Sequence, residues 1–173
     1  FQTSGAYPPP YTHWNVGYGG SFGVFPATMS TNRGPIRLEI LHIENGYDRN
    51  FESNHSEWLS SFRPDAVIVC FDGISKKRSN EAVKQCRSVH NVCGNIPIVV
   101  SGMGHCLRTK FCMRWLRNAV KAARSKSRHP LRCNIVSVHA VDAVRGCNLK
   151  RPLVNVCKAL LGDDGLQRVQ QSA

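Results

Sequence analysis

Acidic residues are scarce in this sequence, and one long segment lacks them altogether. The chain has 11 Asp and Glu against 23 Lys and Arg, which gives a formal net charge of +12. Between Glu81 and Asp142, sixty residues contain eleven Lys or Arg and no acid. A segment of this kind predicts an anionic partner, either nucleic acid or an acidic protein surface. A solvated basic surface is the alternative.

Long apolar runs are also missing. Although 42% of the residues are hydrophobic, no apolar stretch approaches eighteen residues, so the sequence predicts a soluble chain without a membrane-spanning helix. Residues 1–20 lack the basic and apolar regions of a secretory signal. The first residue is Phe1 rather than Met, which leaves a start upstream of Phe1 open. The length of 173 residues predicts a single domain.

The eight cysteines include no C-x-x-C pair, so the usual spacing of a zinc site is absent. Two short His/Cys groups remain, at residues 90–93 and 105–106, and they provide too few ligands for us to expect a metal. Without a secretory signal, we expect the cysteines to be reduced and several of them to be buried as small hydrophobic residues. Seven histidines make chance Cys–His proximity common, so we expect no nucleophilic pair.

Two apolar runs separated by a helical interval indicate an α/β fold. Residues 66–71 are rich in β-branched side chains and bounded by turn formers, which predicts a central strand buried on both faces. Residues 96–102 form a second such run, and residues 79–91 between them have helical spacing. The pair therefore predicts a β-α-β unit with a parallel sheet.

The remaining segments complete the expected order of elements. Residues 1–21 contain three consecutive prolines and no regular period, so we expect an irregular N-terminal arm and then one domain over residues 22–173. Asn, Gly and Pro in residues 30–35 predict a β-hairpin. The expected elements are hairpin strands at 22–29 and 36–41, a polar loop at 42–53, a short helix at 54–62, a strand at 134–140 and a helix at 152–161 that stops at Gly162.

Residues 108–128 predict a long amphipathic helix that ends before Pro130. Apolar residues at 111, 115, 119 and 122 fall on one side. Cations recur on the opposite side at alternating steps of three and four residues, and they form the candidate binding site for nucleic acid or an acidic protein surface. These cations are Arg114, Arg117, Lys121, Arg124 and Arg128. Five cations in one stripe are enough to neutralise several phosphates.

Several stretches resemble the Ran family of nuclear small GTPases. The sequence TNRGPI at residues 31–36 is similar to the hairpin that joins the second and third strands of the family. Residues 95–99 resemble its fifth strand, residues 67–72 its fourth, and residues 158–169 its last helix together with the residues just beyond that helix. The resemblance implies a P-loop NTPase-type fold over about residues 22–169, with a mixed, mostly parallel sheet flanked by helices. It also implies a nuclear or nucleocytoplasmic location and a connection with nucleocytoplasmic transport.

The nucleotide-binding motifs that the resemblance implies are absent. No G-x-x-x-x-G-K-[ST] is present to cradle phosphates and hold magnesium. Where the family has its magnesium, guanine and Ser-Ala-Lys motifs, the chain has HIENG at residues 42–46, MGHC at 103–106 and DAV at 142–144. The sequence therefore predicts a pseudo-GTPase: a non-catalytic scaffold that contacts a protein partner and needs no cofactor.

Two alternatives to the scaffold stay open. One is a truncated or divergent Ran-type protein that binds GTP and magnesium. The other is a nucleic-acid-binding module that uses the basic helix at residues 108–128.

The resemblance also implies a first strand that the sequence does not supply. In the family this strand lies between the third and fourth strands, and nothing upstream of Phe22 matches it. Three explanations stay open: residues that precede Phe1, a different strand order, or a strand added by a partner at the sheet edge.

Overall fold

The computed structural model describes more than half of the chain. The described residues are 14–16, 20–43, 56, 59–72, 76–104, 114, 117–118, 120–121, 133–142 and 144–167. The chain divides into two compact units, one made of residues 1–55 and 166–173 and the other of residues 56–165. The sequence predicts an arm over residues 1–21 and one domain over residues 22–173. These bounds differ from those of the two units, and the predicted division stays a prediction.

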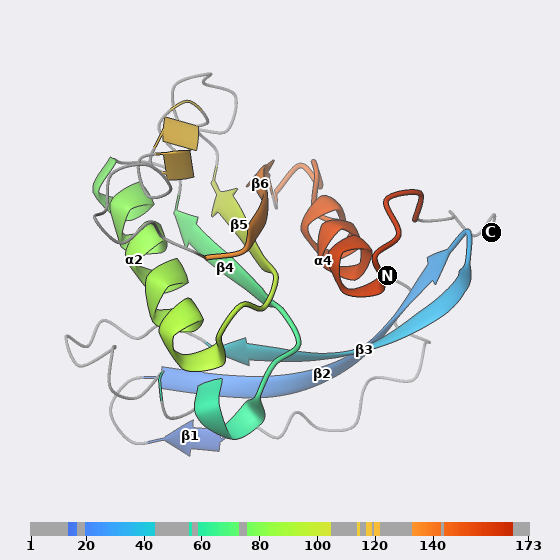
Figure 1. Cartoon of the computed structure of the whole chain (residues 1–173), viewed down its shortest axis with the longest axis horizontal. Helices are drawn as coiled ribbons and strands as arrows, with labels where there is room; N and C mark the ends of the chain where they lie inside the picture. Colours follow the sequence, from blue (N-terminus) through green and yellow to red (C-terminus); the bar gives the residue numbers. More distant parts are fainter. Residues whose placement is uncertain are drawn as a thin grey trace. The chain divides into compact units, whose positions relative to one another are not determined.

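The first unit contains an antiparallel sheet of three strands in the order β1-β2-β3 (Figure 1). These strands are β1 (Trp14–Val16), β2 (Gly20–Thr31) and β3 (Gly34–Ile43). The predicted hairpin is confirmed, with longer strands than expected. The prediction of an irregular arm is wrong for β1 and for the start of β2, because these two segments pair with each other as antiparallel strands. The polar loop begins after Ile43 rather than at His42.

The hairpin turn is tighter than the sequence predicts, because Thr31 already pairs with Gly34. The Thr31 hydroxyl donates to the carbonyl of Gly34 at 2.6 Å and accepts from the backbone N–H of Arg33 at 3.1 Å. Gly34 has a φ of 105°, which a side chain would strain. Along β3, residues 36, 38 and 40 are half-buried while residues 35, 37 and 39 are exposed, which is the alternation of a strand with one packed face.

The second unit contains a parallel sheet in the order β4-β5-β6 (Figure 1). Its elements are β4 (Val67–Asp72), α2 (Lys76–Cys93), β5 (Ile98–Met103), β6 (Ile135–Val141) and α4 (Arg151–Leu161). The predicted β-α-β unit is confirmed, since β4 pairs with β5 in parallel and α2 lies between them in the chain. The last helix stops at Gly162, whose φ is 63°.

The centre of the parallel sheet is β5 rather than β4. Five of the six residues of β5 are buried, whereas Cys70 and Asp72 of β4 are exposed. The expectation of a β4 strand buried on both faces is therefore wrong. The reason is topological, because β5 has a strand on each side while β4 pairs with β5 alone among the described strands.

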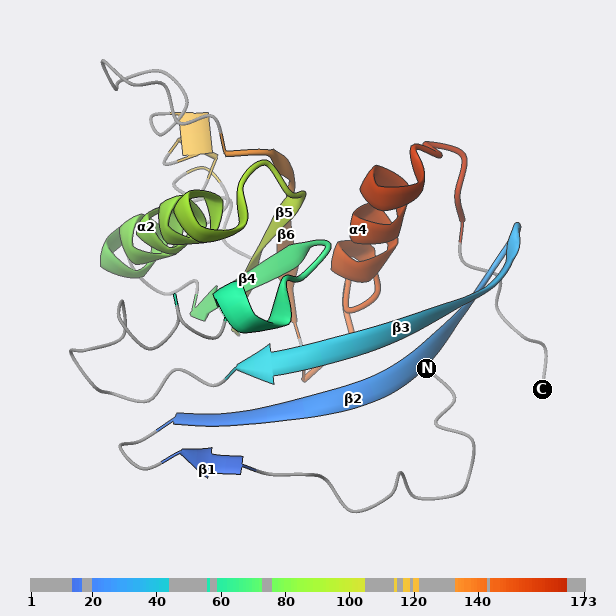
Figure 2. The same cartoon turned by 60° about the horizontal axis from the view of Figure 1, so that its bottom comes forward.

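Helices cover both faces of the parallel sheet, and Figures 1 and 2 show α2 and α4 on opposite sides of it. The α2 side holds a buried core that includes Val69, Ile98, Val100, Ile135, Ala82, Cys86 and Val89. Alternate strand residues point to the other side, where Asn155 of α4 contacts His139 of β6. Each face of the sheet therefore has a distinct environment.

The structure shows an α/β chain with a parallel sheet flanked by helices, but the six strands in the described residues form two sheets. The expected single mixed sheet would place all of them together. Among the described strands, β3 pairs with β2 and β4 pairs with β5, and neither has a second partner on its outer edge. In the part of the chain that the structure describes, no helix is both long and apolar enough to span a membrane.

Candidate functional site

The carboxyl ends of β4, β5 and β6 lie at one edge of the parallel sheet, where open α/β sheets usually bind ligands. Two acidic residues lie at this edge: Asp72 at the end of β4 and Asp142 directly after β6. Gly104 follows β5 with a φ of 132°, and a Cβ at this position would lie 3.4 Å from Oδ1 of Asp72. The edge thus brings together two acids and a glycine conformation that other residues rarely adopt.

The turn after β6 is held by hydrogen bonds among its own residues and to β6. Asp142 and Cys147 exchange two backbone hydrogen bonds at 3.1 and 3.0 Å. Oδ1 of Asp142 accepts the backbone N–H of Arg145 at 3.0 Å, and Asp142 is only 8% exposed. The side-chain amide of Asn148 donates to the carbonyl of Ala140 at 3.0 Å. This turn is therefore closed by contacts within itself and with β6.

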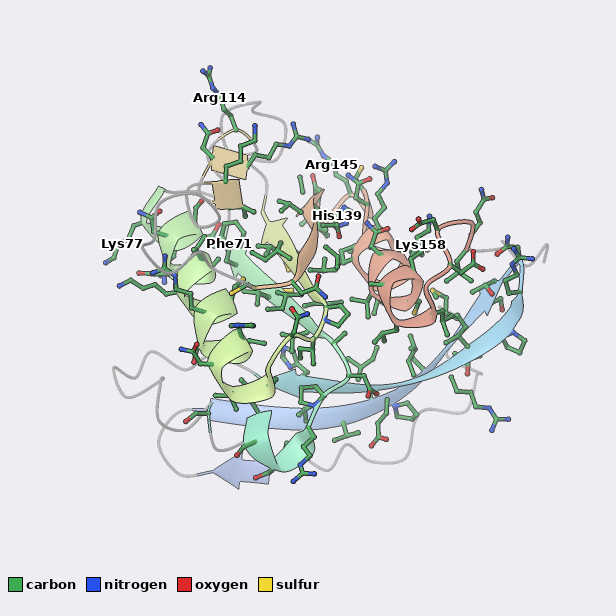
Figure 3. The ribbon with its side chains drawn as sticks, in the orientation of Figure 1. Phe71, Lys77, Arg114, His139, Arg145 and Lys158 are labelled. Atoms are coloured by element: carbon green, nitrogen blue, oxygen red, sulfur yellow. The ribbon has the colours of Figure 1, made fainter. Side chains whose placement is uncertain are left out.

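On the α4 side of the sheet, two polar side chains meet at the imidazole of His139, which Figure 3 labels. Nε2 of His139 lies 2.9 Å from Oγ of Ser137 and 2.8 Å from Nδ2 of Asn155. Burial lowers the pKa of His139, and the positive charge of Arg151 lowers it further. A neutral ring can accept the Asn155 amide proton at Nε2.

This cluster does not match a nucleophilic triad. In such a triad the third residue holds Nδ1 of the histidine, which leaves Nε2 for the nucleophile. Here Asn155 contacts the same nitrogen as Ser137. These contacts therefore link β6 to α4, and we assign no catalytic role to the three residues.

Three of the five predicted cations lie in the described residues. Arg114, Arg117 and Lys121 are helical and exposed, and Figure 3 shows the Arg114 side chain projecting away from the ribbon. Val120 is 5% exposed and belongs to the core on the α2 side of the sheet. Arg124 and Arg128 lie outside the described residues, as do the side chains at 111, 115, 119 and 122.

A second polar stripe, which was not predicted from the sequence, lies on α2. Its members are Lys77, Asn80, Lys84, Arg87 and Asn91, and all five are exposed. They recur at steps of three and four residues, which places them along one side of a helix. The buried residues of α2 mark the other side, and they include Ala82, Cys86 and Val89. The spacing of the polar residues was the signal that could have identified this stripe.

The histidine and cysteine residues give no metal centre among the described residues, where no three potential ligands cluster. Nδ1 of His90 lies 3.0 Å from the carbonyl of Gly94, and the Cys93 thiol contacts the carbonyl of Leu59. Residues 105–106, the other His/Cys group, lie outside the described part.

Six cysteines are described, and all six are free thiols. Cys86, Cys133 and Cys157 are buried as expected, whereas Cys70 and Cys147 are exposed because they lie on an edge strand and in a surface turn. Burial, with a smaller effect of Cys133, raises the pKa of Cys86 to about 12. A thiol of that pKa is not a thiolate nucleophile at neutral pH.

The chain matches no protein-family model, and no curated protein matches it either. The resemblance to the Ran family rests on residues 31–36, 67–72, 95–99 and 158–169 alone.

Proposed function

We propose that this chain is a Ran-like pseudo-GTPase, a non-catalytic scaffold that acts through contacts with a protein partner. The parallel β4-α2-β5 unit and the helix α4 agree with the α/β arrangement that the resemblance implies. The chain has no phosphate-loop motif, so backbone N–H groups and a lysine are not arranged in the sequence to cradle phosphates. This combination supports a chain that keeps the α/β fold implied by the resemblance but does not bind or hydrolyse GTP.

The closed turn after β6 is the observation that carries the proposal. In the resemblance, residues 142–144 take the place of the Ser-Ala-Lys loop, which is one of the family's nucleotide-binding motifs. Here the Asp142 carboxylate is occupied by the N–H of Arg145, and the Asp142–Cys147 hydrogen bonds close the loop. Both features disfavour a nucleotide at this edge.

Isothermal titration with GTP and with GDP in magnesium buffer tests this proposal. We expect no binding heat for the folded chain, while a Ran-family GTPase in the same buffer serves as the positive control. A circular dichroism melt establishes that the titrated protein is folded. Binding with a micromolar or tighter Kd contradicts the scaffold and favours the GTP-binding alternative.

The proposal includes a nuclear or nucleocytoplasmic location and a connection with nucleocytoplasmic transport. Fluorescence imaging of the tagged full chain in cells tests the location, and we expect nuclear signal. Exclusion of the protein from the nucleus contradicts this part of the proposal and leaves the absence of GTP binding as a separate result.

A further inference from the structure

The exposed side of α2 presents a straight row of polar and basic groups. From Lys77 to Asn91 the helix rises by about 21 Å at 1.5 Å per residue. Among the described residues, no carboxylate forms an ion pair with Lys77, Lys84 or Arg87, and Glu81, the one acid in α2, pairs with Arg78 at 3.1 Å. The positive charge of the row is therefore available to an external anion.

A second set of cations lies on the same side of the parallel sheet. Val120 packs into the core that α2 also builds, through Cys86 and its neighbours. Arg114, Arg117 and Lys121, which are exposed in this second segment, therefore belong to the same side of the unit as α2. The opposite face is covered by α4 (Figures 1 and 2). Six exposed cations from two segments consequently lie on one side of the sheet.

The composition of this surface favours phosphate over an acidic protein. Lysine is depleted from protein–protein interfaces, which instead are enriched in aromatic residues, methionine and arginine. Of those types the five α2 positions include Arg87 alone, and none of the five is aromatic or a methionine. Asparagine amides interleaved with cations are common donors to phosphate oxygens.

The same composition favours a duplex over a single strand. Proteins that bind single strands stack bases on aromatic side chains, and the α2 row provides none. The helix holds the donors in a rigid row, which suits the regular phosphate spacing of a double helix. Contacts to the backbone of a duplex require no unstacking of its bases. Backbone contacts of this kind bind without sequence preference.

We propose that this side of the unit is a binding surface for double-stranded nucleic acid. The surface consists of Lys77, Lys84, Arg87, Arg114, Arg117 and Lys121, which contact the phosphate backbone, with Asn80 and Asn91 as additional donors. The inference goes beyond the scaffold function and holds whether or not the chain binds GTP.

Fluorescence anisotropy with the full chain and a mixed-sequence DNA duplex tests the surface over a series of KCl concentrations. With six phosphate contacts, the slope of log Kobs against log[KCl] is about −5, and affinity falls about 2,000-fold between 50 and 200 mM. The variant Lys77→Gln, Lys84→Gln, Arg87→Gln removes three phosphate contacts. Its affinity should therefore fall only about 40-fold between 50 and 200 mM KCl. The single strand is expected to bind more weakly than the duplex.

A matched control removes the same charge from outside the surface. The variant Arg37→Gln, Lys150→Gln, Arg151→Gln changes three exposed cations, two of them at or next to α4 on the opposite face, and should keep the slope of the wild type. Circular dichroism compares the folding of both variants. If the α2 triple variant does not fold, the single variants replace it, and each should reduce the magnitude of the slope by about 0.9.

Three results overturn the proposal. The first is wild-type protein that binds no duplex at 50 mM KCl. The second is a control variant that weakens binding as much as the α2 variant, because net charge alone then explains the effect. The third is displacement of the duplex by polyglutamate at a lower charge concentration than by unlabelled duplex, which assigns the surface to an acidic protein.

Discussion

Asn32 and Gln167 exchange two hydrogen bonds although 135 positions separate them in the chain. The backbone N–H of Asn32 donates to the carbonyl of Gln167 at 2.9 Å, and the backbone N–H of Gln167 donates to Oδ1 of Asn32 at 2.8 Å. The tip of the β2–β3 hairpin is thereby joined to the segment just after Leu166, a residue with no exposed surface. The hairpin sequence thus has a structural role beyond its turn.

Replacing Asn32 with Ala should expose the Gln167 amide to exchange. The substitution removes the side-chain acceptor and retains the backbone bond, so we expect a loss of about 1 kcal/mol in the free energy of unfolding. Hydrogen exchange measured by mass spectrometry should show faster exchange at Gln167. Asn32→Asp keeps an acceptor oxygen and is the matched control. Unchanged protection of Gln167 in Asn32→Ala contradicts the assigned bond.

Replacing Ile98 with Ala should destabilise the second unit strongly. Ile98 has no exposed surface and contributes to the core between the sheet and α2. Loss of its side chain leaves a cavity, which typically costs about 2–5 kcal/mol. Urea denaturation measures the change, and Val136→Ala on the neighbouring strand, where Val136 is 39% exposed, should cost less than about 0.5 kcal/mol. Equal costs at the two positions would contradict the assignment of the core.

Gly162 ends α4 in a left-handed conformation, so a side chain there should cost stability. A Cβ at Gly162 meets nothing within 4 Å, and the cost of Gly162→Ala is therefore one of backbone conformation, about 1 kcal/mol. Gly162→Asn is the control, because asparagine tolerates this region better and should cost less. Thermal denaturation compares the three proteins. An Ala variant as stable as the wild type contradicts the cap.

The elements that the sequence predicted well are those with local signals. The last helix was predictable because Pro152 suits the first turn and Gly162 suits the left-handed cap. The hairpin was predictable from Asn32 and Gly34. In contrast, which strand occupies the centre of the parallel sheet depends on pairing between distant segments, and the apolar run of β4 looks as central as that of β5.

The candidate site was predictable only in part, for a similar reason. The spacing of Arg114, Arg117 and Lys121 indicates a shared side of a helix. It does not reveal that α2 presents Lys84 and Arg87 on the same side of the sheet, because that depends on Val120 entering the α2 core. The meeting of His139 with Asn155 likewise requires α4 to pack on β6.

The burial of His139, together with the nearby charge of Arg151, should make stability depend on pH. The folded state lowers the pKa of His139 below its ordinary value of 6.5, so the unfolded chain binds the proton more readily. The stabilisation from neutral His139 is therefore complete above pH 6.5 and is lost as the pH falls from 6.5 towards the lower folded pKa. Urea denaturation at pH 7.5 and 5.5 measures this loss.

Two variants separate His139 from the other titrating groups. His139→Gln removes the imidazole and should reduce the difference in unfolding free energy between the two pH values. Arg151→Gln removes a positive charge that lowers the His139 pKa, so an NMR titration of the ring should show that pKa move up towards 6.5. If His139→Gln leaves the pH difference unchanged, protonation of this ring does not govern the packing of α4 on β6.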